Sequence, residues 1–547
     1  MNLDAEVVIV GAGPVGLALA GDLAWRGHQV LLIEKGDGSI FQPKMDLVGI
    51  RTMEFCRKWG IAKDVEESEY DRDYPQDNVY LTSLNGYELG RQAMPSMNME
   101  KPPIESPQKR ERCPQNYFDP ILKKFALSQK NCQIQYSTEV LGFSEVNNEI
   151  SIQIKNLKNN KETNIRSTFL VGCDGAKSIV RNNLGIEMHG KGLLTYTTNI
   201  IFKCSEFNSL HNKDPGYRYM FVGPHGTWCT IVAINGRDQW RMSLIGSAKE
   251  KRVYTIDEIT SLAHQAMGKK FDFEILSILP WQRAELVADQ YRMGNIFICG
   301  DACHLTSPTG GLGMNTGIGD AVDLSWKLSA YLQGWAGESM LDSYFVERQP
   351  IAKRITQFST GNLEIMKKLP TNSLIFEDSP EGDIVRAQVG TAMSEGLKRE
   401  WFSMNMHLGN RYTNSPINIY DEIENFENQK VEFEDAIHYI PSSRPGSRAP
   451  HVWLKNGTST LDLISKNFSL FCFSDNSKEI TRFTDLTHEL KIPLDIHFID
   501  SQEVSNLYEF KFVMIRPDGH IAWRANTLDM NIAKFWSVLT GNANSKL

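Results

Sequence analysis

The chain has 547 residues, of which 41% are hydrophobic and 23% are charged, and its net charge at pH 7 is −8. At about 150 residues per domain, this length predicts three or four globular units. The negative net charge argues against nucleic acid or an anionic membrane as the main partner. No apolar run reaches the roughly 18 residues of a membrane span. Nine cysteines without paired spacing favour free thiols in a reducing compartment, so a cytoplasmic protein is expected.

The first motif, EVVIVGAGPVGLALAGDL, lies near the amino terminus. A β-branched run, Val7–Val10, leads into Gly11, Gly13 and Gly16, and an apolar helical period follows. In this pattern the first glycine permits the turn, the second lets a pyrophosphate approach the backbone, and the third lets helix and strand pack closely. A second apolar run ends at Glu34, whose carboxylate can accept hydrogen bonds from ribose hydroxyls. The segment therefore predicts dinucleotide binding at a helix N-terminus.

A second motif, NIFICGDACHLTSPTGGLGMNTGIGDAVDL, also places an acid after an apolar strand. Asp301 follows the strand Ile296–Cys299, so its carboxylate emerges at the carboxyl end of a strand, where open α/β sheets bind ligands. A glycine-rich loop then leads into a helical period from Ile318 to Leu328, whose N-terminus can stabilise the negative charge of a reduced isoalloxazine ring. The alternative is a glycine-rich helix cap in which the acid only satisfies local backbone donors.

A third motif, FLVGCDGAKSIVRNNLGI, lies between the other two. It places Phe169–Val171 on a strand, Asp174 and Gly175 at the tip of that strand, and Arg181 on a following helix. An acid at this strand end suits a site for a flavin and a nicotinamide cofactor. The plain alternative is a turn formed by the Asp-Gly dipeptide.

Together the three motifs resemble those of the FAD-dependent aromatic hydroxylases, the group A flavoprotein monooxygenases of the phenol hydroxylase and para-hydroxybenzoate hydroxylase type. The resemblance covers the chain up to about residue 350. It implies an α/β fold with a Rossmann-like FAD-binding domain and an inserted β-sheet substrate domain. The layout of the remaining chain resembles the C-terminal thioredoxin-like α/β domain of the larger phenol hydroxylases.

The resemblance also implies which residues contact FAD. Arg112 and Gln115 look like the flavin-contacting pair of the family, and Val140 looks like its adenine contact. Lys44 stands where many relatives have arginine, which keeps the charge but loses the bidentate fork, and Leu312 stands where glutamine is common. The expected cofactor contacts are Gly11, Ala12, Gly13, Pro14, Val15, Gly16, Glu34, Lys35, Lys44, Arg112, Gln115, Val140, Asp174, Gly175, Asp301, Pro308, Gly311, Leu312, Gly313, Met314 and Asn315.

The chain divides into four predicted parts. Aromatic and β-branched runs around Gly223 to Gly226 indicate a hairpin in the substrate domain. A Pro/Gly/Ser-rich stretch marks the start of the last part, which holds only Cys472 and therefore no dithiol site. The predicted limits are 1–75, 101–190 and 285–360 for the FAD-binding domain, 76–100 and 191–284 for the β-rich substrate domain, 361–440 for a helical and loop bridge, and 441–547 for the thioredoxin-like domain.

The implied reaction is the hydroxylation of a phenolic or polycyclic aromatic substrate by O2 through a flavin C4a-hydroperoxide. NADPH or NADH is the expected reductant, and because no second GxGxxG unit follows, we expect it to visit the flavin site transiently. The expected partners are thus a small aromatic molecule, O2 and NAD(P)H; no metal is expected, and a homodimer is left open. Two alternatives remain, namely a flavoprotein of another class, such as a halogenase or a dehydrogenase, and a non-catalytic flavin-fold protein that binds a metabolite.

Two residues are candidates for catalysis. Asp46 stands five residues before Arg51, a spacing that resembles the catalytic acid of phenol hydroxylase-like members, and a base that takes a phenol proton contributes to rate. Arg241, on a predicted strand of the substrate domain, could hold an anionic substrate group. The alternatives are a capping or loop role for Asp46 and a solvated position for Arg241.

Overall fold

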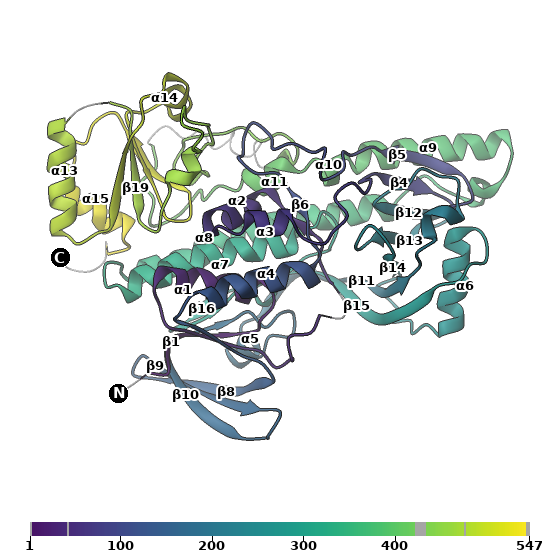
Figure 1. Ribbon diagram of the computed structural model, residues 1–547, viewed down its shortest axis with the longest axis horizontal. Helices are drawn as coiled ribbons and strands as arrows, with labels where there is room; N and C mark the ends of the chain where they lie inside the picture. The colour runs from purple at the N-terminus through teal and green to yellow at the C-terminus, as the bar shows by residue number, and fades with distance from the viewer. Residues whose placement is uncertain (1–2, 41–42, 422–433, 475–476, 543–547) are drawn as a thin grey trace.

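The computed structural model describes residues 3–40, 43–421, 434–474 and 477–542. In these residues two large sheets and one four-stranded sheet are arranged around two long helices, α7 (Gly313–Leu332) and α8 (Glu338–Lys367) (Figure 1). The four-stranded sheet lies at one end of the molecule and one of the large sheets lies at the other. This architecture confirms the predicted α/β fold.

The sheet that contains the amino-terminal strand is built around β1 (Ala5–Val10). Its Val and Ile residues are buried because helices or other strands cover both faces, as is usual for a parallel sheet. Since β17, β10, β1 and β2 run parallel, their carboxyl ends meet at one edge. The order is β16 (Arg292–Met293), β17 (Ile296–Ile298), β10 (Glu162–Gly172), β1, β2 (Val30–Ile33) and β7 (Cys132–Gln135), and β8 (Thr138–Val146) and β9 (Glu149–Asn156) extend from β10.

Helix α1 (Pro14–Arg26) covers this sheet between α7 and α4 (Gln115–Ser128). The approach of α1 to α4 depends on Gly21, because a Cβ atom there would lie 2.6 Å from the ring of Phe125. The shorter helices of this part are α2 (Ile50–Trp59), α3 (Ala62–Glu66) and α5 (Ile179–Asn183).

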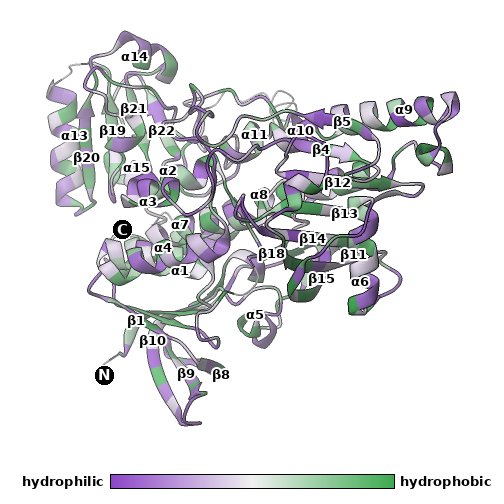
Figure 2. Cartoon of the chain, turned by 45° about the vertical axis from the view of Figure 1, so that its right-hand side comes forward, coloured by the Kyte–Doolittle hydropathy of each residue, from purple (hydrophilic) through white to green (hydrophobic). Residues whose placement is uncertain are grey.

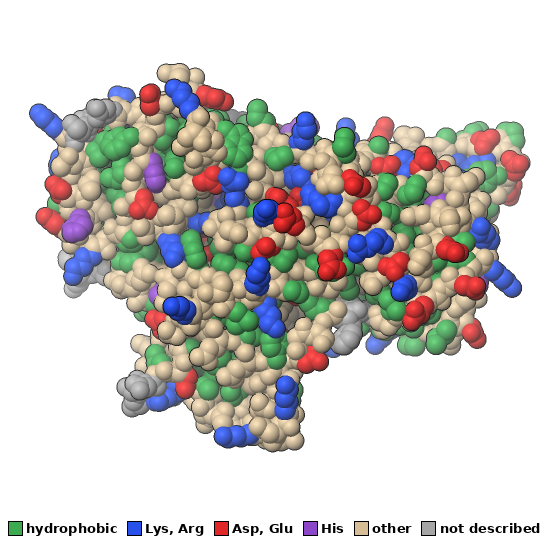
Figure 3. All heavy atoms as spheres, viewed as in Figure 1, with side chains coloured by type: hydrophobic (Ala, Val, Ile, Leu, Met, Phe, Trp, Pro, Cys, Tyr) green, Lys and Arg blue, Asp and Glu red, His purple; other side chains and the backbone are tan. Residues whose placement is uncertain are grey.

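Charges of both signs are interspersed over the face seen in Figure 3, in keeping with the modest net charge of the chain. Among the residues that the structure describes, no helix combines the length and the apolarity that a bilayer span requires.

The second large sheet, which we call the roof sheet, is mainly antiparallel. Its order is β18 (His304–Leu305), β15 (Glu274–Ala288), β11 (Met188–Lys203), β14 (Gln239–Ile245), β13 (Gly226–Ala233), β12 (Arg218–Gly223), β4 (Asn78–Leu81) and β5 (Glu88–Gln92). Helix α6 (Ile256–Met267) lies between β14 and β15 in the sequence. Three further helices come after α8, namely α9 (Pro380–Gly396), α10 (Lys398–Trp401) and α11 (Met404–Leu408).

The two faces of the roof sheet have different partners. Tyr219 and Phe221 point to the side that α6 covers and form a core with it. Met220 and Val222, on the opposite side, pack with Met366 of α8 and with α9. Figure 2 colours the strands of this sheet by the hydropathy of their residues, with hydrophobic residues in green. The face opposite α6 is therefore the one turned toward α8.

The C-terminal unit has a four-stranded sheet flanked by helices, as predicted for a thioredoxin-like domain. Cys472, at the end of a buried strand, is its one cysteine, and burial raises the pKa of this thiol to about 12. The order is β20 (Leu494–Phe498), β19 (Phe468–Cys472), β21 (Phe512–Ile515) and β22 (Ile521–Ala525), with α13 (Ser477–Glu489), α14 (Gln502–Tyr508) and α15 (Ile532–Leu539) around it.

A buried ionic network joins the C-terminal unit to α7 and α8. Nη1 of Arg516 lies 2.5 Å from Glu347 on α8, and Nη2 lies 3.1 Å from Asp323 on α7 and 2.6 Å from Asp518. Lys327 pairs with Asp323 at 2.7 Å and also with Glu347, and all five side chains are at most 2% exposed. Burial raises the pKa of Asp323 well above its usual value, although the charges of Lys327 and Arg516 oppose this shift.

Removal of the Arg516 guanidinium should therefore destabilise the whole protein. Arg516→Met leaves carboxylates buried without their partner, which typically costs about 3–5 kcal/mol. Thermal or denaturant unfolding of the variant measures the loss. Arg482→Met, at an exposed arginine on α13, is the matched control and should unfold like the parent. Equal stability of the two variants would contradict the structural role of the network.

Candidate functional site

The three glycine motifs meet at the carboxyl edge of the parallel sheet. A Cβ atom on Gly11 would lie 2.5 Å from the carbonyl oxygen of Cys173, so the first turn rests against the third motif. A Cβ atom on Gly317 of α7 would lie 2.6 Å from Val15, and one on Gly300 would lie 3.1 Å from the same side chain. Segments nearly 300 residues apart in the sequence therefore form one site, at the edge where α/β sheets bind ligands.

The geometry around the first turn fits a pyrophosphate. A Cβ atom on Gly16 would lie 1.9 Å from the carbonyl oxygen of Gly11, so this glycine is required by packing. A Cβ atom on Gly13 would meet no described heavy atom within 4 Å, so the backbone there opens to free space. Within the described residues, the first turns of α1 and α7 hold neither a side-chain cap nor an acid. Both helix N-termini can thus bind anionic groups.

The three acids of the motifs have different surroundings. Glu34 accepts hydrogen bonds from the backbone N–H groups of Ala12 at 2.8 Å and Gly36 at 2.7 Å. Asp174 caps α5 through one carboxylate oxygen, whereas its buried Oδ1 has no partner in the described part of the chain. Asp301 is exposed to solvent, and desolvation by the protein atoms around it raises the pKa of its carboxyl.

A second set of predicted contacts lies at the start of α4. Gln115 accepts a hydrogen bond from the backbone N–H of Lys44 at 3.0 Å and donates one to Asp119 at 3.0 Å. Burial raises the pKa of Asp119 to about 7. The remaining residues of the set are spread around the sheet: Lys35 is exposed after β2, Val140 is buried in β8, and Gly175 opens to free space beside Asp174.

The loop before α7 is fixed to the segment that carries Asp46. Asn315 accepts hydrogen bonds from the backbone N–H of Gly49 and from the hydroxyl of Thr52, both at 2.7 Å. Its amide donates to the carbonyl groups of Leu47 and Gly311. The residues of this loop differ in exposure: Pro308 is exposed, Gly311, Gly313 and Met314 are half-buried, and Leu312 is buried at the helix N-terminus.

Asp46 lies at the centre of a polar cluster between the FAD-binding part and the roof sheet. A two-stranded ribbon, β3 (Leu47–Val48) with β6 (Glu111–Arg112), places Asp46 3.1 Å from Arg112. From the roof side, Tyr217 donates a 2.5 Å hydrogen bond to Asp46, and Arg241 lies 3.4 Å from it. The guanidinium of Arg112 also stacks on the ring of Tyr217, 3.6 Å from its centroid.

The cluster controls the charge of Asp46. Burial raises the pKa of this carboxyl, but the guanidinium groups of Arg112 and Arg241 and the hydrogen bond from Tyr217 outweigh that effect, so the pKa lies below the ordinary value of 3.8. Asp46 is therefore ionised at neutral pH.

A second polar cluster comes from a part of the chain that the sequence did not single out. Glu400 on α10 accepts hydrogen bonds from Arg218 of β12 at 3.0 Å and from the backbone N–H of Gly310 at 2.9 Å. Arg283 of β15 belongs to the same region, because Arg218 and Glu400 both act on it electrostatically. No local sequence pattern signals these residues, and the hydrogen bonds of Glu400 join segments 90 or more positions apart.

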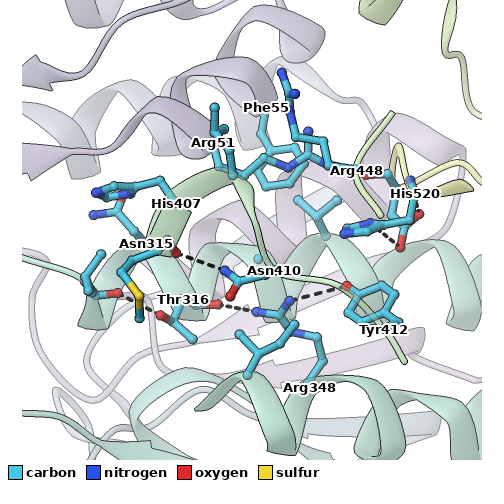
Figure 4. Close-up of a pocket in the computed structure, with 17 residues that line it drawn as sticks. Arg51, Phe55, Asn315, Thr316, Arg348, His407, Asn410, Tyr412, Arg448 and His520 are labelled. Carbon is cyan, nitrogen blue, oxygen red and sulfur yellow. Dashed lines mark hydrogen bonds and ion pairs between the residues drawn. The ribbon is translucent and has the colours of Figure 1, made fainter. Parts of the chain in front are cut away.

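A small cavity of about 50 Å³ lies behind the N-terminus of α7, at the junction with the C-terminal unit (Figure 4). There Arg348 donates hydrogen bonds to the hydroxyl of Tyr412 and to the carbonyl of Thr316, and His407 and His520 line the wall. Ligand pockets for small molecules are usually about 300 Å³ or larger, so this cavity suits one or two water molecules. It is part of the domain junction and not a site for an aromatic substrate.

The fold brings three glycine motifs together at the carboxyl edge of a parallel sheet, beside two helix N-termini that have no side-chain cap among the described residues. Residues 4–359 match the family described as "FAD binding domain", and residues 442–541 match "Aromatic-ring hydroxylase, C-terminal". The first match spans more than half of the chain. The chain therefore belongs to the FAD-binding family of aromatic-ring hydroxylases, and it is an FAD-dependent aromatic monooxygenase.

Individual relatives agree along the whole length. The chain is 27% identical to the 2,4-dichlorophenol 6-monooxygenase of Cupriavidus pinatubonensis (strain JMP 134 / LMG 1197), over 97% of this chain and 95% of that protein. It is 28% identical to the phenol 2-monooxygenase of Pseudomonas sp. (strain EST1001), over 98% and 93%. Among solved structures, chromopyrrolic acid-soaked RebC with bound 7-carboxy-K252c is 31% identical with a TM-score of 0.91, covering 99% of this chain and 100% of that chain.

Gly13 of the first turn and Gly361 of α8 should respond differently to alanine, although both positions are open. Gly13→Ala adds a methyl group that meets no protein atom, so the protein should fold normally but bind FAD at least about tenfold more weakly, because the methyl group enters the space of the pyrophosphate. Gly361→Ala, at another open position, is the control and should retain FAD. Flavin content and FAD titration of the apoprotein test this. Unchanged FAD affinity of the Gly13 variant would place the pyrophosphate elsewhere.

The buried imidazoles of the junction cavity predict a loss of stability in acid. Burial lowers the pKa of His520 to about 4, with Asp518 opposing and Arg51 and Arg516 reinforcing the shift. An unfolded histidine has a pKa of about 6.5, so this contribution is complete above pH 6.5 and is lost as the pH falls toward 4. At pH 5 the loss is about 2 kcal/mol.

Thermal unfolding at pH 7 and pH 5 tests this expectation. The melting temperature of His520→Asn should fall less between the two pH values than that of the parent. His488→Asn, at an exposed histidine on α13, should keep the pH sensitivity of the parent. The same fall in melting temperature in all three proteins would show that His520 takes up a proton as readily in the folded state as in the unfolded state.

Proposed function

We propose that the protein hydroxylates a phenolic ring held between the roof sheet and the loop before α7, with Asp46 binding the reacting hydroxyl group. The observation that carries the proposal is the cluster of Asp46, Tyr217, Arg112 and Arg241, which joins the two parts of the chain at that place. Bound FAD, reduced by NAD(P)H, supplies the oxygen atom from O2.

The residues around the cofactor have separate tasks in this proposal. Gly13 and the N-terminus of α1 bind the pyrophosphate, and Glu34 binds the adenosine ribose. Asp301 holds the ribityl chain, and the N-terminus of α7 faces the ring, where its partial positive charge stabilises the anionic reduced form. These assignments and the domain limits remain predictions.

Asp46 is a poor base for a resting phenol but a good acceptor during the reaction. A phenol has a pKa of about 10, so proton transfer to a carboxyl with a pKa below 3.8 costs at least about 8 kcal/mol. The ionised carboxylate can still hold the hydroxyl group by a charge-assisted hydrogen bond. As oxygen transfer draws electrons from the ring, the hydroxyl group becomes far more acidic, and Asp46 then takes its proton.

Two wider predictions accompany this function. All nine cysteines are free, which supports a reducing compartment and hence the cytoplasm. A homodimer stays a prediction, which light scattering of the purified protein can test.

Asp46→Asn tests the catalytic assignment. The variant should retain FAD, because Asp46 is placed on the substrate side, and it should hydroxylate roughly 100-fold more slowly, since acid–base groups typically contribute 10²–10⁴. A screen of phenols, naphthols and polyketide-like quinones for stimulated NAD(P)H oxidation provides the assay, with product analysis for the inserted oxygen. Asp485→Asn, on α13 far from the site, is the control. An unchanged rate in the Asp46 variant refutes its role.

A further inference from the structure

Three arginines of the roof sheet lie on the face opposite α6. Arg218 of β12 and Arg241 of β14 both pair with Val232 of the intervening strand, and directly paired residues point to the same side of a sheet. Arg283 of β15 pairs with Thr195 of β11. Thr195 lies six positions from Ile201, the partner of Arg241, and residues an even number apart share a face.

Arg283 is a buried cation without a counterion. The residue is 3% exposed, and its Nε donates a hydrogen bond to the hydroxyl of Thr197 at 3.2 Å. Within the described part of the chain its Nη1 is buried without a partner, and no carboxylate forms an ion pair with it. Burial lowers its pKa to about 10, with the charge of Arg218 adding to the shift, so Arg283 remains protonated at neutral pH. Buried charges in proteins are normally paired.

The neighbouring groups share this incomplete satisfaction. Among the described atoms, Nε of Arg218 and Oε2 of Glu400 are also buried and have no hydrogen-bond partner. Glu400 uses its other oxygen for Arg218 and for the backbone of Gly310 in the loop before α7. The open donors next to that loop, Nη1 of Arg283 and Nε of Arg218, indicate that an acceptor from outside the chain binds there.

The charges of the whole site favour an anion. Four guanidinium groups, those of Arg112, Arg218, Arg241 and Arg283, accompany two carboxyl groups, those of Asp46 and Glu400. A positive excess remains whatever the protonation of the acids. Asp46 is already held by Arg112, Tyr217 and Arg241, so the unmatched cation is at Arg283.

We infer that Arg283, with Arg218, binds a carboxylate substituent of the aromatic substrate, so that the preferred substrates are aromatic acids. A guanidinium fork matches a carboxylate in planar, bidentate geometry. The ionised Asp46 repels such a group, so the substrate lies with its phenolic hydroxyl at Asp46 and its carboxylate at Arg283. This inference rests on the proposed function, because it names the substrate class of that same site.

Binding of a matched acid and amide tests the inference. The holoenzyme is titrated with a hydroxynaphthoate and with the corresponding hydroxynaphthamide in chloride-free buffer at pH 7, and the flavin absorbance reports binding. The acid should bind at least about tenfold more tightly than the amide. In Arg283→Gln the acid should lose at least about tenfold in affinity while the affinity for the amide stays within about twofold. Arg283→Lys should retain part of the preference.

Two controls separate recognition from a structural role. Arg252→Gln, at an exposed arginine between β14 and α6, should bind both compounds like the parent. Arg283→Gln removes an unpaired buried charge, so its FAD content and melting temperature should not fall. A lower melting temperature together with equal weakening of acid and amide would make Arg283 a structural residue and overturn the inference.

The remaining outcomes are also decisive. Equal affinity of the parent for acid and amide, or no binding of either, overturns the carboxylate subsite. Hydroxylation of the amide without preference for the acid leaves the proposed function intact and removes only the subsite. A preference for the acid that depends on Arg283, without any hydroxylated product, supports the subsite and contradicts the proposed function.

Discussion

The burial of three ionisable side chains on α7 fixes the position of this helix and of the loop before it. Asp320 accepts hydrogen bonds from Arg348 of α8 and contacts His304 of the roof sheet, both at 2.7 Å. One and two turns further on, Asp323 and Lys327 form the network that includes Arg516. Each of these charges would be costly inside the protein without its partner, so the helix can occupy only the position in which all of them are paired.

Because the helix is fixed, its N-terminus is fixed as well. The partial positive charge of that end is useful only if it is directed at the place where a ring becomes anionic, and the error that can be tolerated is a fraction of an ångström. Asn315 and Glu400 extend this rigidity to the loop, since the first binds the segment after Asp46 and the second binds Gly310. The site is thereby held from the amino-terminal segment, the roof sheet and the bridge at once.

The sequence predicted the fold and the place of the site because both depend on local patterns. Glycines after buried strands are local signals, and the carboxyl ends of parallel strands meet without further information. Tyr217 was harder to assign, because it precedes β12 and strand alternation does not decide where its ring points. Glu400 and Arg283 could not be found in this way. Glu400 is distinguished by its contact with Gly310, 90 positions away, and Arg283 by a buried Nη1 that has no partner among the described residues.

The C-terminal unit takes part in this arrangement through packing. Its buried Cys472 stands alone, and a thiol with a pKa of about 12 is a poor nucleophile, so the unit cannot exchange disulfides as thioredoxins do. What it does supply is Arg516 and a hydrophobic core shared with Trp326 and Met340 of α7 and α8. Without that unit, Asp323 and Glu347 would lose the guanidinium of Arg516, which pairs with both. Helix α7, which we propose faces the flavin, would then lose a constraint that sets its direction, so a domain without a dithiol site helps to form the proposed redox site.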